Sequence, residues 1–190
     1  ELFGGPLREQ IDLYWSHCGT SRGRAYELIK KDKISNFQDL EIFSNEIISS
    51  GFKTIKTNIA ILKEHPYIYM PGFAKSNGWP ELNCPEELIE SINSWISNFR
   101  DFLGKDINIA LDLNFNFRTS GFIKIAKALE KYNLAWLEID SYDPQSLKEI
   151  KNKINIPITS CENLYGIRQY KPYFDHRSMD IVSVDIIWNG

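Results

Sequence analysis

This sequence lacks an excess of one charge, a membrane-spanning apolar run and a secretory signal, three features that are typical of other classes of protein. There is no excess of either charge, because 22 Lys and Arg residues face 25 Asp and Glu residues, a formal charge of −3. Without a broad cationic face to neutralise a phosphate backbone, we expect no nucleic-acid partner. No apolar run approaches the roughly 18 to 20 residues of a membrane span, and no charged start leads into the apolar core of a secretory signal. We therefore expect no membrane partner and a cytoplasmic location.

Cysteine is also scarce. Cys18, Cys84 and Cys161 are odd in number and lack the spacing of metal ligands, which fits a reducing compartment better than a disulfide framework. We expect all three to be packed thiols. By contrast, 43% of the residues are hydrophobic and 25% are charged, as in a globular domain with a sizeable core. Because the chain begins at Glu1 and ends at Gly190 just after an apolar run, we expect it to be part of a longer protein.

Apolar runs rich in β-branched residues alternate with stretches of helical spacing. This order is typical of repeated βα units around a parallel sheet. The predicted strands are residues 11–15, 52–57, 107–113, 134–139, 156–161 and 180–186. The predicted helices are residues 40–50, closed by Gly51, and residues 85–103, 119–132, 144–154 and 165–174. Residues 65–83, rich in proline, glycine and aromatic residues, are expected to form one long loop, either a specificity lid or an oligomer contact.

Four acidic residues stand at the expected carboxyl ends of successive strands. Asp112, Glu138, Glu162 and Asp185 are 23 to 26 residues apart, about one βα unit, so we expect them at one level of the sheet. A single acid after a strand is commonly a helix cap or a solvated loop residue. Adjacent strands lie about 4.8 Å apart, so Asp112, Glu138 and Glu162 are predicted to converge on one hard cation, for which Mg²⁺ is the natural choice.

Polar side chains accompany these acids. Lys56 and Asn58 end the second predicted strand on one face, and Asn114 shares the inward face of Asp112. A lysine at the end of a buried strand needs an anionic partner, which a substrate could supply. His17 follows the first predicted strand and either reaches the same opening or is a packed structural residue.

Six segments, in this order, resemble the enolase superfamily, and within it the mandelate racemase and sugar acid dehydratase branch. They are Leu2-Phe3-Gly4-Gly5-Pro6 with Arg8 and Tyr14, Gly51-Phe52-Lys53-Thr54-Ile55-Lys56-Thr57-Asn58, Asp112-Leu113-Asn114, Trp136-Leu137-Glu138, Ser160-Cys161-Glu162-Asn163, and Asp180-Ile181-Val182-Ser183-Val184-Asp185. The resemblance covers nearly the whole chain.

The resemblance implies a fold and a chemistry. The fold is α/β, a modified TIM-type (β/α)7β barrel, of which residues 1–190 would supply about six strands; an N-terminal capping domain and the last βα units would lie outside this sequence. The chemistry is removal of the proton α to a carboxylate, giving an enediolate stabilised by Mg²⁺ on Asp112, Glu138 and Glu162. Lys56 and Asp185 would be catalytic, Asp185 by supporting a histidine beyond Gly190.

Two positions depart from the family pattern. Asn58 stands where the second lysine of a Lys-x-Lys strand is expected, and it cannot act as a base, which favours dehydration by a histidine. Asn114 stands where the branch has a histidine after the first metal ligand. Asn58, Asn114 and His17 are expected to bind substrate. We therefore expect a Mg²⁺-dependent lyase acting on a small carboxylate, most simply a sugar acid, and a homo-oligomer. A racemase or epimerase of the same branch and a non-catalytic carboxylate-binding protein remain alternatives.

Overall fold

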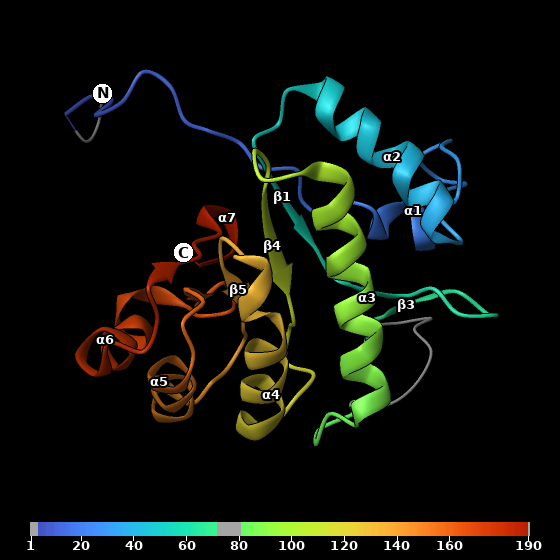
Figure 1. Cartoon of the computed structure of the whole chain (residues 1–190). Coiled ribbons are helices and arrows are strands. Elements are labelled where there is room, and N and C mark those ends of the chain that lie inside the picture. The colour runs from blue at the N-terminus through green and yellow to red at the C-terminus, as the bar shows by residue number, and fades with distance from the viewer. Residues whose placement is uncertain (1–3, 72–80, 190) are drawn as a thin grey trace.

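The computed structural model describes residues 4–71 and 81–189 (Figure 1). Its main sheet is parallel, in the order β1-β4-β5-β6-β7. These strands are Thr54–Thr57, Asn108–Asp112, Leu137–Glu138, Ile158–Ser160 and Ile181–Val182. Each strand lies beside the preceding strand of this sheet. Because crossovers between parallel strands are right-handed, this order places the connecting helices on one face, as in a βα barrel.

The five predicted helices are all present. They are α2 Phe37–Ser50, α3 Glu86–Leu103, α4 Thr119–Leu129, which continues as the 3-10 turn η1 Glu130–Tyr132, α5 Pro144–Lys153 and α6 Gly166–His176. Local chemistry sets their ends. The Asn36 side chain accepts a hydrogen bond from the Asp39 amide at the start of α2, and Gly51 closes that helix at φ 83°. Asp143 caps α5 in the same way, by accepting from the Gln145 amide.

The core lies between these helices and the sheet. The α3 stripe predicted from its spacing is buried, and Trp95, Ile96 and Phe99 are at most 1% exposed. Trp95 and Phe99 contact each other edge to face, with ring centroids 4.7 Å apart. Gly19, at φ 80°, passes over both rings so closely that a Cβ would lie 3.0 Å from Phe99. A glycine is therefore required in the segment that leads from the sheet into α1 (Thr20–Arg24).

The first and last predicted strands are wrong in extent. Of residues 11–15, only Trp15 pairs with the sheet, through a bridge to Ile55, while Ile11 and Leu13 remain 76% and 74% exposed. Their apolar alternation has no neighbouring strand to pack on in the described part of the chain. The sixth predicted strand, 180–186, is reduced to β7, and Ile186–Asn189 forms the short helix α7.

The predicted loop at residues 65–83 contains a strand. β3, Tyr67–Tyr69, pairs antiparallel with β2, Ile59–Ile61, in a separate two-stranded sheet. The prediction of an unbroken loop is therefore wrong, because the apolar run 59–61 continues past the end of β1 and offers β3 a partner. Residues 72–80 of this segment lie outside the described residues.

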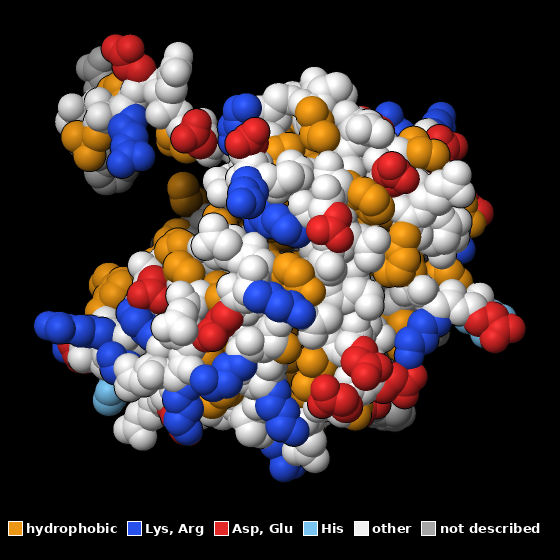
Figure 2. Space-filling model, in the orientation of Figure 1, with side chains coloured by type: hydrophobic (Ala, Val, Ile, Leu, Met, Phe, Trp, Pro, Cys, Tyr) orange, Lys and Arg blue, Asp and Glu red, His pale blue; other side chains and the backbone are white. Residues whose placement is uncertain are grey.

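The surface agrees with the near-balanced charge. Figure 2 shows basic and acidic side chains spread over one face, and neither sign covers it. Cys18, Cys84 and Cys161 are buried free thiols, as predicted. Within residues 4–71 and 81–189, no helix has the length and apolarity to cross a membrane.

Candidate active site

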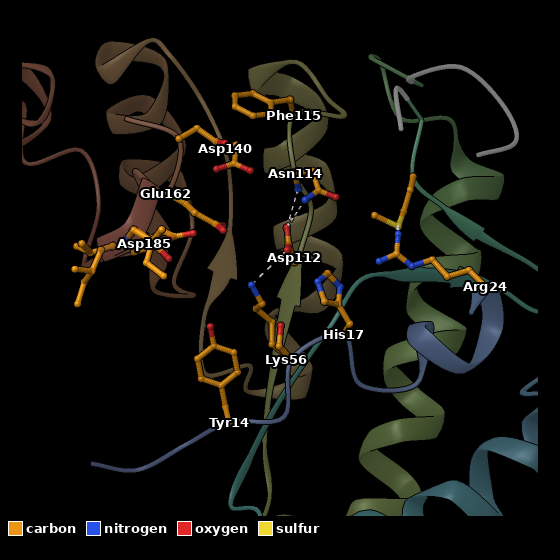
Figure 3. A pocket seen from close by; sticks show the side chains of 17 residues that line it. Tyr14, His17, Arg24, Lys56, Asp112, Asn114, Phe115, Asp140, Glu162 and Asp185 are labelled. Carbon is orange, nitrogen blue, oxygen red and sulfur yellow. Dashed lines mark hydrogen bonds and ion pairs between the residues drawn. The ribbon is translucent and has the colours of Figure 1, made fainter. Parts of the chain in front are cut away.

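A cavity of about 970 Å³ opens at the carboxyl ends of the parallel strands (Figure 3). Six of the eight side chains predicted to form a site line it: His17, Lys56, Asp112, Asn114, Glu162 and Asp185. The other two, Asn58 and Glu138, are 2% exposed and hydrogen-bond to lining residues. The structure thus places all eight residues in or directly behind the wall of one cavity at this edge of the sheet.

The centre of the cavity is a buried ammonium between two buried carboxylates. Lys56 Nζ donates to Glu138 Oε2 at 2.7 Å and lies 3.4 Å from Asp112 Oδ2. The three residues are 7%, 2% and 5% exposed, respectively. Lys56 lies on β1, Asp112 ends β4 and Glu138 ends β5, and Asp112 pairs with Glu138 in the sheet register. Such charges are tolerated in the interior only as partners of one another.

The charges at this centre do not balance. Burial disfavours the Lys56 ammonium, but the carboxylates of Asp112 and Glu138 outweigh burial and raise its pKa. Burial, opposed by Lys56, raises the pKa of Asp112. Burial, the charge of Asp112 and the Glu162 carboxyl outweigh the opposing effect of Lys56 and together raise the pKa of Glu138 to about 8. One ammonium thus faces three acidic groups, and the site favours additional positive charge.

Glu162 and Asp185 lie beyond the level of the other two acids. Glu138 pairs with Thr159, so Glu162 is three residues further along its chain. Asp185 follows β7 and accepts hydrogen bonds from the amides of Ile187 and Trp188, which caps α7. The expectation of one common level is wrong for both, because the strand register places Thr159 and Ile181 at the level of Glu138. Both side chains nevertheless line the cavity.

The acidic residues suit a divalent cation by their chemistry. Asp112, Glu138 and Glu162 offer only carboxylate oxygens, the ligands that Mg²⁺ prefers. The buried Oε1 atom of Glu138 has no hydrogen-bond partner among the described residues, and a cation would satisfy it. As the side chains stand, however, no three His, Cys, Asp or Glu residues in the described part of the chain are grouped closely enough to hold a metal. The Lys56 ammonium instead contacts Asp112 and Glu138.

Asn114, His17 and Asn58 form the polar wall around this centre. The Asn114 backbone amide and side-chain amide both donate to Asp112 Oδ1, at 3.0 and 2.9 Å, and so orient that carboxylate. His17 Nδ1 lies 2.8 Å from Asn58 Oδ1. Of the two readings left open for His17, the structure thus supports a cavity-lining residue, held by a buried amide.

The lining residues that were not predicted include two charged ones, Asp140 and Arg24. Asp140 lies two residues after Glu138, and this Glu-x-Asp spacing was an available signal. Burial and the charge of Asp112 raise the pKa of Asp140 to about 7. Arg24 ends α1, a helix that the apolar pattern did not indicate, and its guanidinium donates to the Met70 sulfur at 3.3 Å. Figure 3 places Asp140, Glu162 and Asp185 on one side of Asp112, and His17 and Arg24 on the other.

We expect the metal-free protein to lose stability as the pH rises from about 5 to 8. Unfolded carboxyl groups titrate near pH 4, whereas folded Asp140 and Glu138 titrate at about 7 and 8. Between these values the folded protein holds protons that the unfolded chain has released, so raising the pH favours unfolding. Urea unfolding with a chelator at pH 5, 6, 7 and 8 measures this slope. Asp140→Asn should flatten it and exposed Asp101→Asn should not; a pH-independent midpoint would contradict the prediction.

The comparisons with known proteins point to one family. The sequence model described as "Enolase C-terminal domain-like" matches residues 45–190. The D-galactonate dehydratase family member RspA of Pantoea ananatis (strain LMG 20103) is 24% identical over 204 residues, which cover 98% of this chain and 45% of that protein. The arabinonate dehydratase of Saccharolobus solfataricus is 25% identical over 148 residues, 75% of this chain and 38% of that protein. The chain thus spans less than half the length of these relatives.

Solved structures agree with this assignment. A crystal structure from Burkholderia xenovorans strain LB400, provisionally named L-alanine-DL-glutamate epimerase, is 39% identical, with a TM-score of 0.91 over 100% of this chain and 48% of that one. A second structure of that protein, bound to magnesium and fumarate, has a TM-score of 0.90 at the same identity. The parallel sheet with its helices on one face therefore corresponds to part of a barrel of this kind.

Proposed function

The chain belongs to the enolase C-terminal domain-like family, and from that premise we propose that its cavity removes the proton α to the carboxylate of a small hydroxy acid. The observation that most strongly supports this function is the Lys56 ammonium, which lies between the buried carboxylates of Asp112 and Glu138 at the carboxyl ends of β1, β4 and β5. Polar groups concentrated at that end of a parallel sheet are typical of a catalytic site.

We propose Mg²⁺ as the cofactor, held by Asp112, Glu138 and Glu162. When bound, the ion supplies electrostatic stabilisation to the negative charge that develops on a carboxylate as its α-proton leaves. Three features support the proposal: the all-oxygen side chains, the unpartnered Oε1 of Glu138, and the raised pKa of Glu138. The magnesium bound to the 39% identical Burkholderia protein supports it as well. Asn114 would keep Asp112 oriented through its two hydrogen bonds.

We propose that Lys56, besides pairing with the acids, binds the substrate. With Mg²⁺ held by the carboxylates, the Lys56 ammonium would be free to contact the substrate carboxylate at the edge of the cavity. In the metal-free structure the neighbouring acids raise the pKa of Lys56, and we propose that the negative charge of the substrate carboxylate keeps it protonated when a cation neutralises those acids. Lys56 therefore binds and neutralises substrate and does not act as the base, and Asp185 is proposed to support a proton-transferring histidine on its own side of the cavity.

Dehydration of a sugar acid is the reaction that we propose. The relatives include a D-galactonate dehydratase family member and an arabinonate dehydratase, and in this chain Asn58 stands where a second lysine base is expected. Racemisation or epimerisation is the second candidate, supported by the provisional name of the Burkholderia protein. Both begin with the same proton abstraction and differ in whether a β-hydroxyl leaves. We further propose that the protein is a cytoplasmic homo-oligomer. Residues 1–190 would form one segment of its barrel domain.

Proton exchange in D2O tests the function. The full protein is incubated with Mg²⁺ and either D-galactonate or D-arabinonate, and the products are followed by NMR. A 2-keto-3-deoxy acid formed with loss of water supports the dehydratase, and α-deuterated starting acid or its epimer without loss of water supports the epimerase. Binding of the acids without exchange or turnover would overturn the enzymatic proposal and favour a non-catalytic carboxylate-binding protein.

A further inference from the structure

A histidine at the cavity is held by a buried amide in one ring orientation. The Asn58 carboxamide oxygen, as assigned, accepts the Thr20 hydroxyl at 3.3 Å and lies 2.8 Å from His17 Nδ1. Asn58 and Thr20 are 2% and 1% exposed, so water does not compete for this oxygen. In this orientation of the Asn58 carboxamide, its oxygen only accepts hydrogen bonds, which places the proton of the His17 ring on Nδ1. The Asn58 Nδ2 atom then has no hydrogen-bond partner among the described residues. The other ring nitrogen of His17, Nε2, is left with a free lone pair.

The backbone that carries His17 is anchored to β1. The amides of Trp15 and Cys18 donate to the carbonyls of Thr54 and Lys56, at 3.0 and 2.9 Å. His17 itself has a φ of 51°, and its carbonyl accepts from the Ser21 amide in the first turn of α1. This left-handed conformation is uncommon for a residue with a Cβ. The ring thus belongs to the same rigid framework as Lys56, as a reacting group requires.

The position of the ring suits proton transfer. His17 lines the same cavity as Asp112 and Asn114, and Figure 3 shows it on the opposite side of Asp112 from Glu162 and Asp185. Asn58 has no basic atom, so a base at this end of β1 has to come from another residue. The free Nε2 atom of His17 is such a base.

We propose that His17 is the proton-transferring residue on this side of the cavity and that Asn58 is its positioning residue. This inference rests on the proposed function. Nε2 takes the α-proton, and the electron pair of the broken C–H bond forms the enediolate C=C bond. The enediolate then re-forms the carboxylate, a Cα=Cβ bond is made, and the Cβ–O bond breaks. The imidazolium returns its proton to the departing hydroxyl, which leaves as water. In epimerisation, a proton returns to Cα instead.

The tautomer is measurable without metal or substrate. In ¹⁵N-histidine-labelled full protein, a long-range ¹H–¹⁵N spectrum distinguishes the two neutral tautomers, and the signals missing in His17→Asn identify His17. We expect the Nδ1–H form in the wild type and in Asn58→Asp, which keeps the acceptor. Asn58→Leu, of similar size without the acceptor, should lose this preference. An Nε2–H ring in the wild type would overturn the assignment, even if the variants do not fold.

Exchange kinetics then separate this inference from the proposed function. General acid–base groups contribute about 10² to 10⁴-fold in rate, so His17→Asn should slow α-proton exchange by at least about 100-fold. His176→Asn, an exposed histidine on α6, should leave the rate unchanged. Asn58→Leu should reduce kcat more than it changes KM, and Asn58→Asp should restore most of the loss. Full exchange or turnover in folded His17→Asn overturns the role of His17 alone, whereas absence of both exchange and turnover in the wild type overturns the proposed function.

Discussion

Lys56→Met is expected to destabilise the metal-free protein by about 3 to 5 kcal/mol at pH 8, the usual cost of leaving buried charges without their partner. Among the described residues, no other Lys or Arg forms an ion pair with Asp112 or Glu138. Without the ammonium, both carboxyl groups must be protonated or remain uncompensated in a buried site. The loss should shrink toward pH 5, where protonation of the acids in the folded state costs little. Urea unfolding at pH 5 and pH 8 measures both values.

Two controls sharpen this prediction. Lys53→Met removes the same charge three residues earlier in the chain, from an exposed side chain that forms no ion pair with another described residue, and should change stability by less than about 0.5 kcal/mol. Added Mg²⁺ should recover much of the stability lost in Lys56→Met, because a cation between the carboxylates replaces the ammonium. If Lys56→Met is as stable as the wild type at pH 8, the buried ion pair does not stabilise the protein and the prediction is wrong.

Glu138→Gln is expected to abolish both α-proton exchange and stabilisation by Mg²⁺. In the wild type, Mg²⁺ at about 100 times its dissociation constant should add about 2.7 kcal/mol, which corresponds to roughly 5 to 11 °C in Tm for a domain of this size. Glutamine preserves the shape but removes a charged ligand. The metal-free variant should stay folded, and above pH 7 it should gain stability, because Glu138 with a pKa of about 8 is costly to ionise in the folded state.

Thermal unfolding with and without Mg²⁺ checks this result. Glu41→Gln, an exposed position on α2, removes the same charge and should keep the full Mg²⁺ shift and the exchange rate. An unchanged shift in Glu138→Gln would remove this residue from the metal site. Retention of exchange together with loss of the shift would instead separate metal binding from the proton-transfer step.

The elements most accurately predicted were those specified by local chemistry. The α3 stripe of Leu88, Ile92, Trp95 and Phe99 repeats every three or four residues, and a helix is the regular structure that buries such a stripe on one side. The end of α2 followed from Gly51, since glycine adopts the left-handed conformation without strain. Asp112 and Glu138 were placed correctly because each closes an apolar run that becomes a buried parallel strand.

The errors occurred where hydrogen-bonded neighbours outweighed local preference. Ile11 and Leu13 alternate as in a strand, but a strand exists only where another chain segment pairs with it. Asp185 was expected at the end of a strand, yet its carboxylate accepts two backbone amides and starts a helix. The β2–β3 hairpin was missed because its short apolar runs acquire strand geometry only by pairing with each other.

The order of apolar runs and acidic residues was therefore sufficient to indicate a parallel α/β fold with carboxylates gathered at one edge, since periodicity and spacing are local properties of the chain. It could not show that Lys56 bridges Asp112 and Glu138, that Asp140 is buried beside them, or that Asn58 holds the ring of His17. Asn58 and His17 are 41 residues apart, and Lys56 and Glu138 are 82 residues apart. Such pairings arise only when the strands are brought into register, and burial then determines which charges must be shared.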